Sequence, residues 1–379
     1  EGDLIELKPA KVRGEESEGM ICASDEIGIE SLYPAKEDGE IADLSGNDFQ
    51  IGELLASALS LNDIILEIDN KSLTNRPDLW GHYGIAREVA AIYSLKLKKY
   101  DLGKVKYGKA VDLQVEVQDK EGCPRYMGVA LEGIEIKESP EWLKTRLNSI
   151  GQKSINNIVD ITNYIMYDLG QPLHAFSLDK IEDNKIIVRK ADDGEEVSTL
   201  DGEDQILTRN DLVIADKKKA VAVAGVMGNA NSEINETTKN VIIESATFEP
   251  ITIRRTANRL GLRSEAAIRF EKDLDPNLAE VAILKAINLI QLVCPNAKVV
   301  SDLVDVNNFE MDLGPIELGW DFINKRIGQE IEHKKIIGIL QSLGFTVKEK
   351  NDGMKIDIPT WRATRDVRIK EDLIEEITR

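Results

Sequence analysis

The chain has 379 residues, of which 42% are hydrophobic and 31% charged, and its formal net charge is −20. A surface of this charge repels phosphate at long range, which argues against nonspecific binding of duplex nucleic acid. No run of 18 apolar residues is present, so the sequence predicts no membrane span.

The length favours two or three domains rather than one core. The cysteines Cys22, Cys123 and Cys294 lie too far apart for a zinc knuckle or a disulfide framework, which favours a reducing cytoplasm. The sequence begins without Met and ends within a helical pattern, DLIEEITR. We therefore expect it to be a piece of a longer protein.

The first 95 residues contain two helical patterns, IGELLASALSL (51–61) and DLWGHYGIAREVAAIYSL (78–95). Pro77 disfavours helix at the residue before it and is accepted in a first helical turn, so it marks the start of the second helix. The apolar segment IILEIDN (64–70) between the two helices is predicted to form a strand.

From about residue 96 to 310 the pattern changes to short strands placed between helices. Residues 110–117 alternate like a half-buried strand, and residues 154–170 predict a helix that ends at Gly170. Asp-Gly and Asn-rich turns then separate five short apolar runs, which is typical of hairpins. Two further helical patterns follow, so we expect a mixed α/β domain. The runs and helices are KIIVRKA, EEVSTLDG, DLVIAD, AVAVAGVMG, NVIIESA, ITIRRTANRLGL and NLAEVAILKAINLIQLV.

The last 70 residues have the order helix, helix, strand, turn, strand, helix, which is typical of a winged-helix-like module. They also align without a gap with the start of the chain, so that Asp78 falls on Asp366 and Glu88 on Glu376. The predicted fold class is α+β and multidomain, with two small helix-strand-helix modules of similar fold flanking the central domain. The expected limits are 1–95, 96–310 and 311–379.

Four acidic residues near the C-terminal end form a candidate metal site. Asp372, Glu375 and Glu376 stand at i, i+3 and i+4, so they share one helix face, and Asp366 lies six residues upstream. Crowded carboxylates require a cation, and Mg²⁺ prefers oxygen ligands. The alternative is a solvated acidic face in an acidic protein, and the spacing alone leaves both open.

In the central domain, His174 and Glu244 are candidate functional residues. No zinc-binding or serine-nucleophile motif accompanies His174, so its ring belongs either to a pocket or to the core. Glu244 directly follows three apolar residues and therefore lies at a strand end or needs a partner. The small residues Ala222, Ala224 and Gly225 mark either tight sheet packing or the close approach of a ligand.

Taken together, several stretches resemble the β chain of bacterial phenylalanyl-tRNA synthetase, in family order and over most of the chain. They are KPAKVRGEESEGMICASDEIGI (8–29), NRPDLWGHYGIAREVAAIY (75–93), NNIVDITNYIMYDLGQPLHAFSLDKI (156–181), AVAGVMGNANSEINETTKNVIIESATFEP (222–250), RLGLRSEAAIRFEKDLDPN (259–277) and PTWRATRDVRIKEDLIEEI (359–377).

The resemblance implies a subunit of a cytoplasmic α₂β₂ ligase that charges tRNA(Phe) with phenylalanine, using Mg²⁺ and ATP bound at the partner α chain. The central domain would be the editing (B3/B4-like) domain, which hydrolyses Tyr-tRNA made by mistake. The last module would be B5-like and would support tetramer assembly. No class II synthetase motif is present, so the chain itself would carry editing hydrolysis at most.

By motif position, Glu244 would accept the phenolic proton of a misattached tyrosine, whereas phenylalanine would leave this carboxylate unpaired. A site of this kind discriminates by roughly 10⁴–10⁵. His174 and Asn163 would orient the terminal adenosine or the attacking water, and Lys153 would contact tRNA phosphate. The implied editing pocket is Thr162, Asn163, His174, Ala224, Glu244, Ser264 and Ala266. The implied Mg²⁺ ligands, at the junction with the α chain, are Asp366, Asp372, Glu375 and Glu376.

The chain departs from the family pattern at Lys153, where Arg is usual, and at Ser264, where Thr is frequent. Asn229 stands where a second Gly is common, and Ile268 where His is frequent. The alternative hypothesis is therefore a structural and docking subunit with weakened or lost editing. A third interpretation, a winged-helix nucleic-acid binder, depends only on the order of elements in the last 70 residues, and the acidic charge argues against it.

Overall fold

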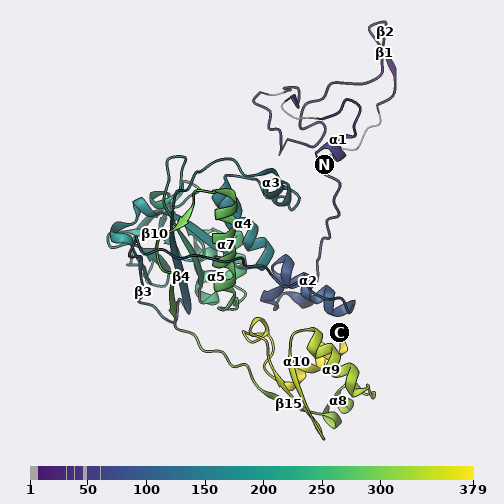
Figure 1. Ribbon diagram of the computed structural model, residues 1–379, viewed down its shortest axis with the longest axis vertical. Helices are drawn as coiled ribbons and strands as arrows, with labels where there is room; N and C mark the ends of the chain where they lie inside the picture. The colour runs from purple at the N-terminus through teal and green to yellow at the C-terminus, as the bar shows by residue number, and fades with distance from the viewer. Residues whose placement is uncertain (1–6, 31, 38, 46–48, 60) are drawn as a thin grey trace. The chain divides into compact units, whose positions relative to one another are not determined.

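The computed structural model describes residues 7–30, 32–37, 39–45, 49–59 and 61–379 and contains two compact units. The first unit comprises residues 1–66 and 144–154, and the second comprises residues 67–143 and 155–379 (Figure 1). Among the described residues, no helix is both long enough and apolar enough to cross a membrane.

The first unit has little regular structure. Strands β1 (Ala10–Val12) and β2 (Glu15–Ser17) form an antiparallel hairpin. The two residues between them, Arg13 and Gly14, have φ values of 55° and 94°, which is the positive backbone of a two-residue type I′ turn. Helix α3 (Glu141–Asn148) begins in the second unit and ends in the first.

The helix predicted over residues 51–61 is much shorter in the structure, where helix α1 spans Leu55–Ala58; residue 60 lies outside the described residues. None of the residues of α1 is buried, and Leu54 provides no side-chain cap. A helix of this length without a buried face receives no stabilisation from tertiary packing.

The prediction of a strand over residues 64–70 is wrong, because these residues form neither helix nor strand and are exposed. The segment crosses from the first unit to the second, and no described strand pairs with it. An unpaired strand is not stable in water. The N-terminal module therefore lacks its expected strand, but it shares with the C-terminal module a short helical turn followed by a helix. The aligned acids are also paired alike, because Arg76 binds Asp78 and Glu88 as Arg362 binds Asp366 and Glu376.

That helical part consists of the 3₁₀ turns η1 (Lys71–Leu73) and η2 (Pro77–Leu79) and helix α2 (His82–Ile92). One continuous helix was expected over 78–95, but the chain turns at Gly81, which has extended backbone angles. A Cβ atom on Gly81 would lie 2.3 Å from the backbone nitrogen of Gly170, so only glycine permits this close contact.

The central region contains two five-stranded sheets. One has the order β11-β10-β9-β6-β3, with β3 and β6 parallel and the other pairs antiparallel. In the other, β13, β4, β12 and β5 follow one another and β14 also pairs with β4, all antiparallel. The strands are β3 (Gln114–Val117), β4 (Arg125–Glu132), β5 (Leu173–Ser177), β6 (Lys185–Lys190), β9 (Leu212–Ala215), β10 (Ala220–Val223), β11 (Met227–Gly228), β12 (Val241–Thr247), β13 (Lys298–Val299) and β14 (Val304–Asn307).

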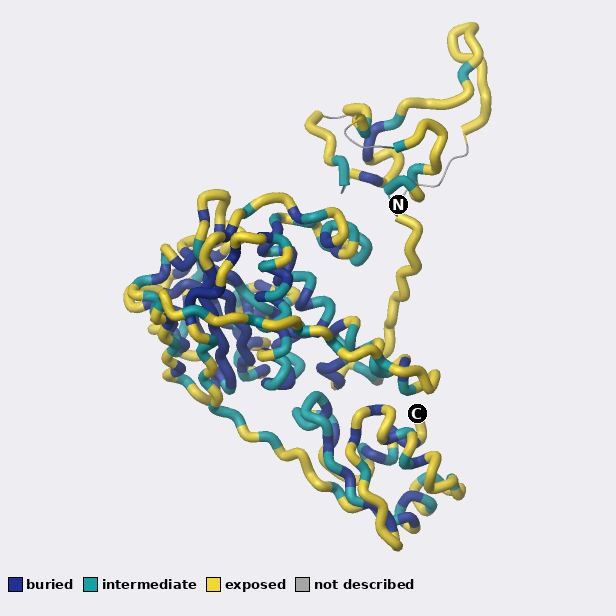
Figure 2. Tube along the Cα trace, viewed as in Figure 1, coloured by how far each residue is buried: buried dark blue, intermediate teal, exposed yellow. Residues whose placement is uncertain are grey.

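The two sheets share one hydrophobic core, which includes Tyr126 and Phe176 from the second sheet and Val188 and Val221 from the first. Helices α5 (Pro250–Leu260) and α6 (Glu265–Phe270) also contribute to this core. Helices α4 (Asn157–Leu169) and α7 (Leu278–Val293) pack against each other and against the second sheet. Figure 2 shows the buried strands at the centre of this region.

Short elements complete the central region. The hairpin of β7 (Glu196–Ser198) and β8 (Asp204–Ile206) is antiparallel. The 3₁₀ turns are η3 (Leu178–Lys180), η4 (Glu182–Asn184) and η5 (Ala230–Ser232). The mixed α/β architecture expected for this region is therefore confirmed.

The C-terminal module has its own core, built around Ile336, Leu340, Ile356 and Leu373. The expected order of two helices, a hairpin and a last helix is confirmed, and a strand that was not predicted precedes it. The sheet order is β15-β17-β16. The elements are β15 (Ile316–Gly319), α8 (Trp320–Ile327), α9 (His333–Ser342), β16 (Thr346–Lys350), β17 (Gly353–Asp357), η6 (Thr360–Arg362) and α10 (Lys370–Thr378).

Candidate functional site

The end of helix α4 positions His174. Asn156 caps the start of α4 by accepting hydrogen bonds from the backbone of residues 158 and 159, and Gly170 ends it in the left-handed conformation, φ 84°. The buried side chain of Gln171 then donates from Nε2 to the backbone oxygen of Ala246 in β12, at 2.8 Å. This bond ties the turn to the sheet, so that β5 pairs with β12 and carries His174.

His174 lies directly opposite Glu244 in the register of β5 and β12. Its ring packs edge-on against Phe176, with 4.5 Å between the ring centroids. On another side it contacts Gly228, where a Cβ atom would lie 2.6 Å from the ring carbon Cε1. The absence of a side chain at residue 228 therefore leaves the space that the imidazole occupies.

Glu244 is buried, with 5% of its surface exposed. The phenol of Tyr126, from β4, donates a 2.7 Å hydrogen bond to Oε2 of Glu244. Burial raises the pKa of Glu244 to about 7, although the hydrogen bond from Tyr126 acts in the opposite direction. The carboxyl group therefore changes its charge near neutral pH, as acid–base and recognition groups in functional sites do.

His174 is half-buried, and its imidazole lies against Phe176 and Gly228. This burial lowers the pKa of His174 to about 4, so the ring is neutral at pH 7. A neutral imidazole has one donor and one acceptor nitrogen. His174 can therefore hold a water molecule or a ligand hydroxyl, but it adds no positive charge to Glu244.

Ala224 and Ser264 belong to a second group of contacts, which lies next to His174. The hydroxyl of Ser264 donates to the backbone oxygen of Val226, at 2.6 Å, and accepts from the backbone of Ala267 as the cap of α6. Ala224 is buried in the shared core, and Ala266 packs at its margin. These residues therefore fix the segment that leads into β11 and Gly228, next to His174.

Thr162 and Asn163 lie on α4, which packs against β5 and α7. The hydroxyl of Thr162 donates to the backbone oxygen of Val159 within the same helix, at 2.7 Å. The structure thus places these two residues on the helix that packs against β5, the strand that carries His174. Lys153 is exposed and belongs to the first unit.

The four C-terminal acids have different hydrogen-bond and ion-pair partners. Glu376 accepts two hydrogen bonds from the buried Arg362, at 2.7 and 3.0 Å, and Asp366 is paired with the same guanidinium. Asp372 instead accepts from the backbone nitrogens of residues 368 and 369 at the start of α10. Glu375 is exposed and pairs with Arg379.

Within the described residues, no group of three His, Cys, Asp or Glu side chains is placed to hold a metal ion. Arg362 already supplies positive charge to two of the four acids, and Arg76 lies 3.6 Å from Asp366. The geometry therefore does not fit the expected Mg²⁺ site. The sequence spacing was right about a shared helix, but it gave no sign that an arginine would take the place of the ion.

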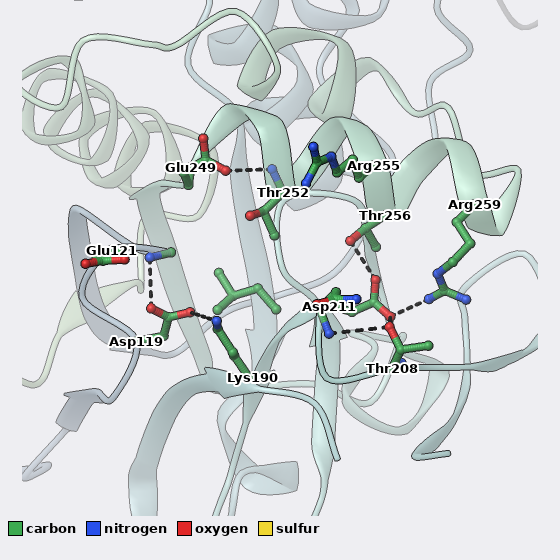
Figure 3. Close-up of a pocket in the computed structure, with 13 residues that line it drawn as sticks. Asp119, Glu121, Lys190, Thr208, Asp211, Glu249, Thr252, Arg255, Thr256 and Arg259 are labelled. Atoms are coloured by element: carbon green, nitrogen blue, oxygen red, sulfur yellow. Dashed lines mark hydrogen bonds and ion pairs between the residues drawn. The ribbon is translucent and has the colours of Figure 1, made fainter. Parts of the chain in front are cut away.

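The structure also contains a cavity of about 420 Å³ that includes none of the predicted site residues (Figure 3). Helix α5 contributes Thr252, Arg255, Thr256 and Arg259 to its wall. The buried Asp211 accepts a hydrogen bond from Thr256 at 2.7 Å and is paired with Arg259. The one available sequence signal was the i, i+4 spacing of the two arginines. The other lining residues are Asp119, Glu121, Gly122, Lys190, Thr208, Asn210, Leu212 and Glu249.

Comparison with known proteins identifies both folded regions of the second unit. Residues 122–295 match the B3/4 domain, and residues 316–379 match the tRNA synthetase B5 domain. The chain is 39% identical over 369 residues to the phenylalanine--tRNA ligase beta subunit of Solibacter usitatus, and 39% over 378 residues to that of Bacillus subtilis. The chain therefore contains a B3/4 domain and a B5 domain and is homologous to phenylalanine--tRNA ligase beta subunits along nearly all of its length.

These alignments cover 97% and 99% of this chain but 47% and 46% of the two beta subunits. The chain therefore spans about half the length of the curated relatives it matches. A crystal structure of an N-terminal fragment of the phenylalanyl-tRNA synthetase beta-subunit from Pyrococcus horikoshii aligns with a TM-score of 0.41 and 17% identity, covering 84% of this chain and 89% of that chain. The B3/4 match includes His174 and Glu244, and the B5 match includes the four C-terminal acids.

Proposed function

We propose that the B3/4 region of this phenylalanine–tRNA ligase beta-subunit homologue hydrolyses Tyr-tRNA(Phe) made in error. One observation carries the proposal. Glu244 is a buried carboxylate opposite His174, and it already binds a phenol, that of Tyr126, at 2.7 Å. This environment suits recognition of the one hydroxyl that distinguishes tyrosine from phenylalanine.

In the proposed reaction, Oε1 of Glu244 accepts the phenolic hydrogen of the misattached tyrosine. Phenylalanine brings no donor and leaves the buried carboxylate without this partner, which costs about 1–3 kcal/mol or more. The neutral His174 holds the attacking water or the terminal adenosine. Water attacks the ester carbonyl, the bond to the ribose oxygen breaks, and this oxygen takes a proton.

For the whole enzyme, we propose an α₂β₂ assembly in the cytoplasm. Its α chain would charge tRNA(Phe) with phenylalanine, using ATP and Mg²⁺. The C-terminal module would take part in assembly with the α chain. Because the acids of this module do not fit a metal site as they stand, we assign no step to Mg²⁺ in this chain.

The test is a charging reaction in which the enzyme, assembled from the full-length beta subunit and its α chain, receives tyrosine in place of phenylalanine. The proposal predicts that Tyr-tRNA(Phe) stays low with the native beta subunit and accumulates with Glu244→Ala. Equal accumulation by the two enzymes would show that Glu244 does not discriminate. Charging with phenylalanine is the control and should be equal in both.

The second candidate is a docking subunit that has lost editing. It is supported by Asn229, which is buried directly after Gly228, at a position where a second glycine was expected. Accumulation of Tyr-tRNA(Phe) by the native enzyme, together with normal assembly and phenylalanine charging, would favour this candidate.

A further inference from the structure

The bond between Tyr126 and Glu244 arises from the register of β4 and β12. Glu244 pairs with Gly128, and Tyr126 pairs with Ala246, so the two polar side chains occupy diagonal positions on neighbouring strands. Diagonal neighbours on one sheet face lie within reach of long and aromatic side chains. The ring of Tyr126 passes Gly128, where an added Cβ atom would lie 3.8 Å from the ring carbon Cε1, and the phenol reaches the carboxylate of Glu244.

The ring of Tyr126 is fully buried in the core that the two sheets share, among residues that include Phe176 and Ala246. A side chain enclosed in this way holds one orientation, because close-packed interiors leave little room for another rotamer. Its hydrogen bond therefore fixes Oε2 of Glu244. No described residue donates a hydrogen bond to Oε1, which leaves this oxygen for an incoming hydroxyl.

We propose that Tyr126 is a positioning residue for substrate discrimination: it holds one oxygen of Glu244 and thereby aims the other at the phenol of a misattached tyrosine. This inference rests on the proposed editing function. It adds that selectivity depends on a buried residue that itself never touches the substrate.

A second consequence concerns the charge of Glu244. The titratable groups that face it are Tyr126, the thiol of Cys123 from the segment before β4, and His174 from β5. Burial raises the pKa of Cys123 and of Tyr126 well above their ordinary values and lowers the pKa of His174 to about 4. Around neutral pH, Glu244 is therefore the member of this cluster that changes its charge.

Tyr126→Phe keeps the ring and removes the hydroxyl donor, so the effect of this substitution can be assigned to the loss of the hydrogen bond. In the assembled enzyme, we expect hydrolysis of Tyr-tRNA(Phe) at pH 7 to slow about tenfold, as loss of a hydrogen bond to a charged group implies. The midpoint of the pH–rate profile should rise by about one pH unit, because the ionised carboxylate loses a stabilising donor. Above this midpoint the rate should stay below the native plateau, once spontaneous ester hydrolysis is subtracted, because the carboxylate is ionised there but is no longer held in place.

Tyr100→Phe is the matched control, because the phenol of Tyr100 donates to Asp168, a carboxylate away from β12. It should leave the midpoint unchanged. If Tyr126→Phe does not fold, replacement of Tyr126 by 3,5-difluorotyrosine keeps the hydroxyl as a stronger donor and should lower the midpoint.

Two results separate the inference from the function on which it rests. If the native enzyme hydrolyses Tyr-tRNA(Phe) and Glu244→Ala does not, while Tyr126→Phe or the fluorinated protein retains the native rate and midpoint, the positioning role is overturned and editing stands. If the native enzyme and Glu244→Ala are equally inactive towards Tyr-tRNA(Phe), the proposed function itself fails.

Discussion

Tyr126 and Glu244, which are 118 positions apart in the chain, are joined by a 2.7 Å hydrogen bond in the shared core of the two sheets. The bond keeps one oxygen of a buried carboxylate in place within a largely apolar surrounding. The charge of this carboxylate therefore affects the stability of the fold as well as the proposed activity.

Replacement of Glu244 by Gln should change how stability depends on pH. The pKa of Glu244 is raised to about 7, so the native state binds a proton that the unfolded state releases at lower pH. The contribution of this protonated carboxyl group to the free energy of unfolding is therefore fully present below the ordinary glutamate pKa and is lost as the pH rises to about 7. This loss amounts to about 3 kcal/mol. Urea unfolding should be measured at pH 5 and pH 8. At pH 8 the free energy of unfolding of Glu244→Gln should exceed that of the native chain by about 3 kcal/mol. An identical pH dependence of the two proteins would contradict the burial argument.

Gly228→Ala should displace the ring of His174. A Cβ atom at residue 228 would lie 2.6 Å from Cε1 and 2.8 Å from Nε2 of that ring, which is closer than real contacts allow. We expect the pKa of His174 to rise from about 4 towards its ordinary value as the ring becomes more exposed. Proton NMR can follow this titration, because the chain has three histidines. Gly338→Ala in α9, where a Cβ atom meets no neighbour, is the control and should leave the spectrum of His174 unchanged.

Arg362→Met should destabilise the C-terminal module strongly. It would leave the buried Glu376 and the carboxylate of Asp366 without their guanidinium partner, at a cost of about 3–5 kcal/mol. Arg326→Met removes an exposed pair with Glu371 and should cost at most about 1 kcal/mol. Hydrogen exchange of the amides in α9 and β17 measures the stability of this module directly. Equal protection in the two variants would show that the buried pair contributes no more than a surface pair.

Divalent cations should bind the native chain weakly at the C-terminal acids, because Arg362 already neutralises Asp366 and Glu376. Titration with Mn²⁺, followed by paramagnetic broadening of the amides in α10, should show no saturable site in the native chain. Arg362→Gln should bind Mn²⁺ more tightly than the native chain, since Asp366 and Glu376 then lose the guanidinium that they share and keep only the longer contacts with Arg76 and Arg379, at 3.6 and 3.5 Å. Saturable broadening in the native chain would instead restore the sequence prediction of a metal site.

The sequence predicted those parts of the site that depend on local signals. The helix expected over 154–170 is present as α4, although it begins later, at Asn157 after a cap at Asn156, and Gly170 has the left-handed conformation that ends it. The turn residues between residues 185 and 247 separate the strands as expected. His174 and Glu244 were both recognised as candidates, and the structure brings them together in adjacent strands.

The remaining parts depend on contacts between distant segments. Strand β4 is buried over seven of its eight residues, so its sequence lacks the alternation that marks a half-buried strand. The sequence therefore gave no sign that Tyr126 is the partner of Glu244. Similarly, the spacing of Asp372, Glu375 and Glu376 predicted a shared helix, but not that Arg362 would bind one of them and the backbone another.

The most direct measurement is the ratio of the hydrolysis rates of purified Tyr-tRNA(Phe) and Phe-tRNA(Phe) by the assembled enzyme, with native Glu244 and with Glu244→Ala. We expect a large preference for Tyr-tRNA(Phe) with the native residue and loss of this preference, through a slower reaction of the tyrosyl ester, in the variant. An unchanged preference in Glu244→Ala would show that Glu244 is not the residue that discriminates.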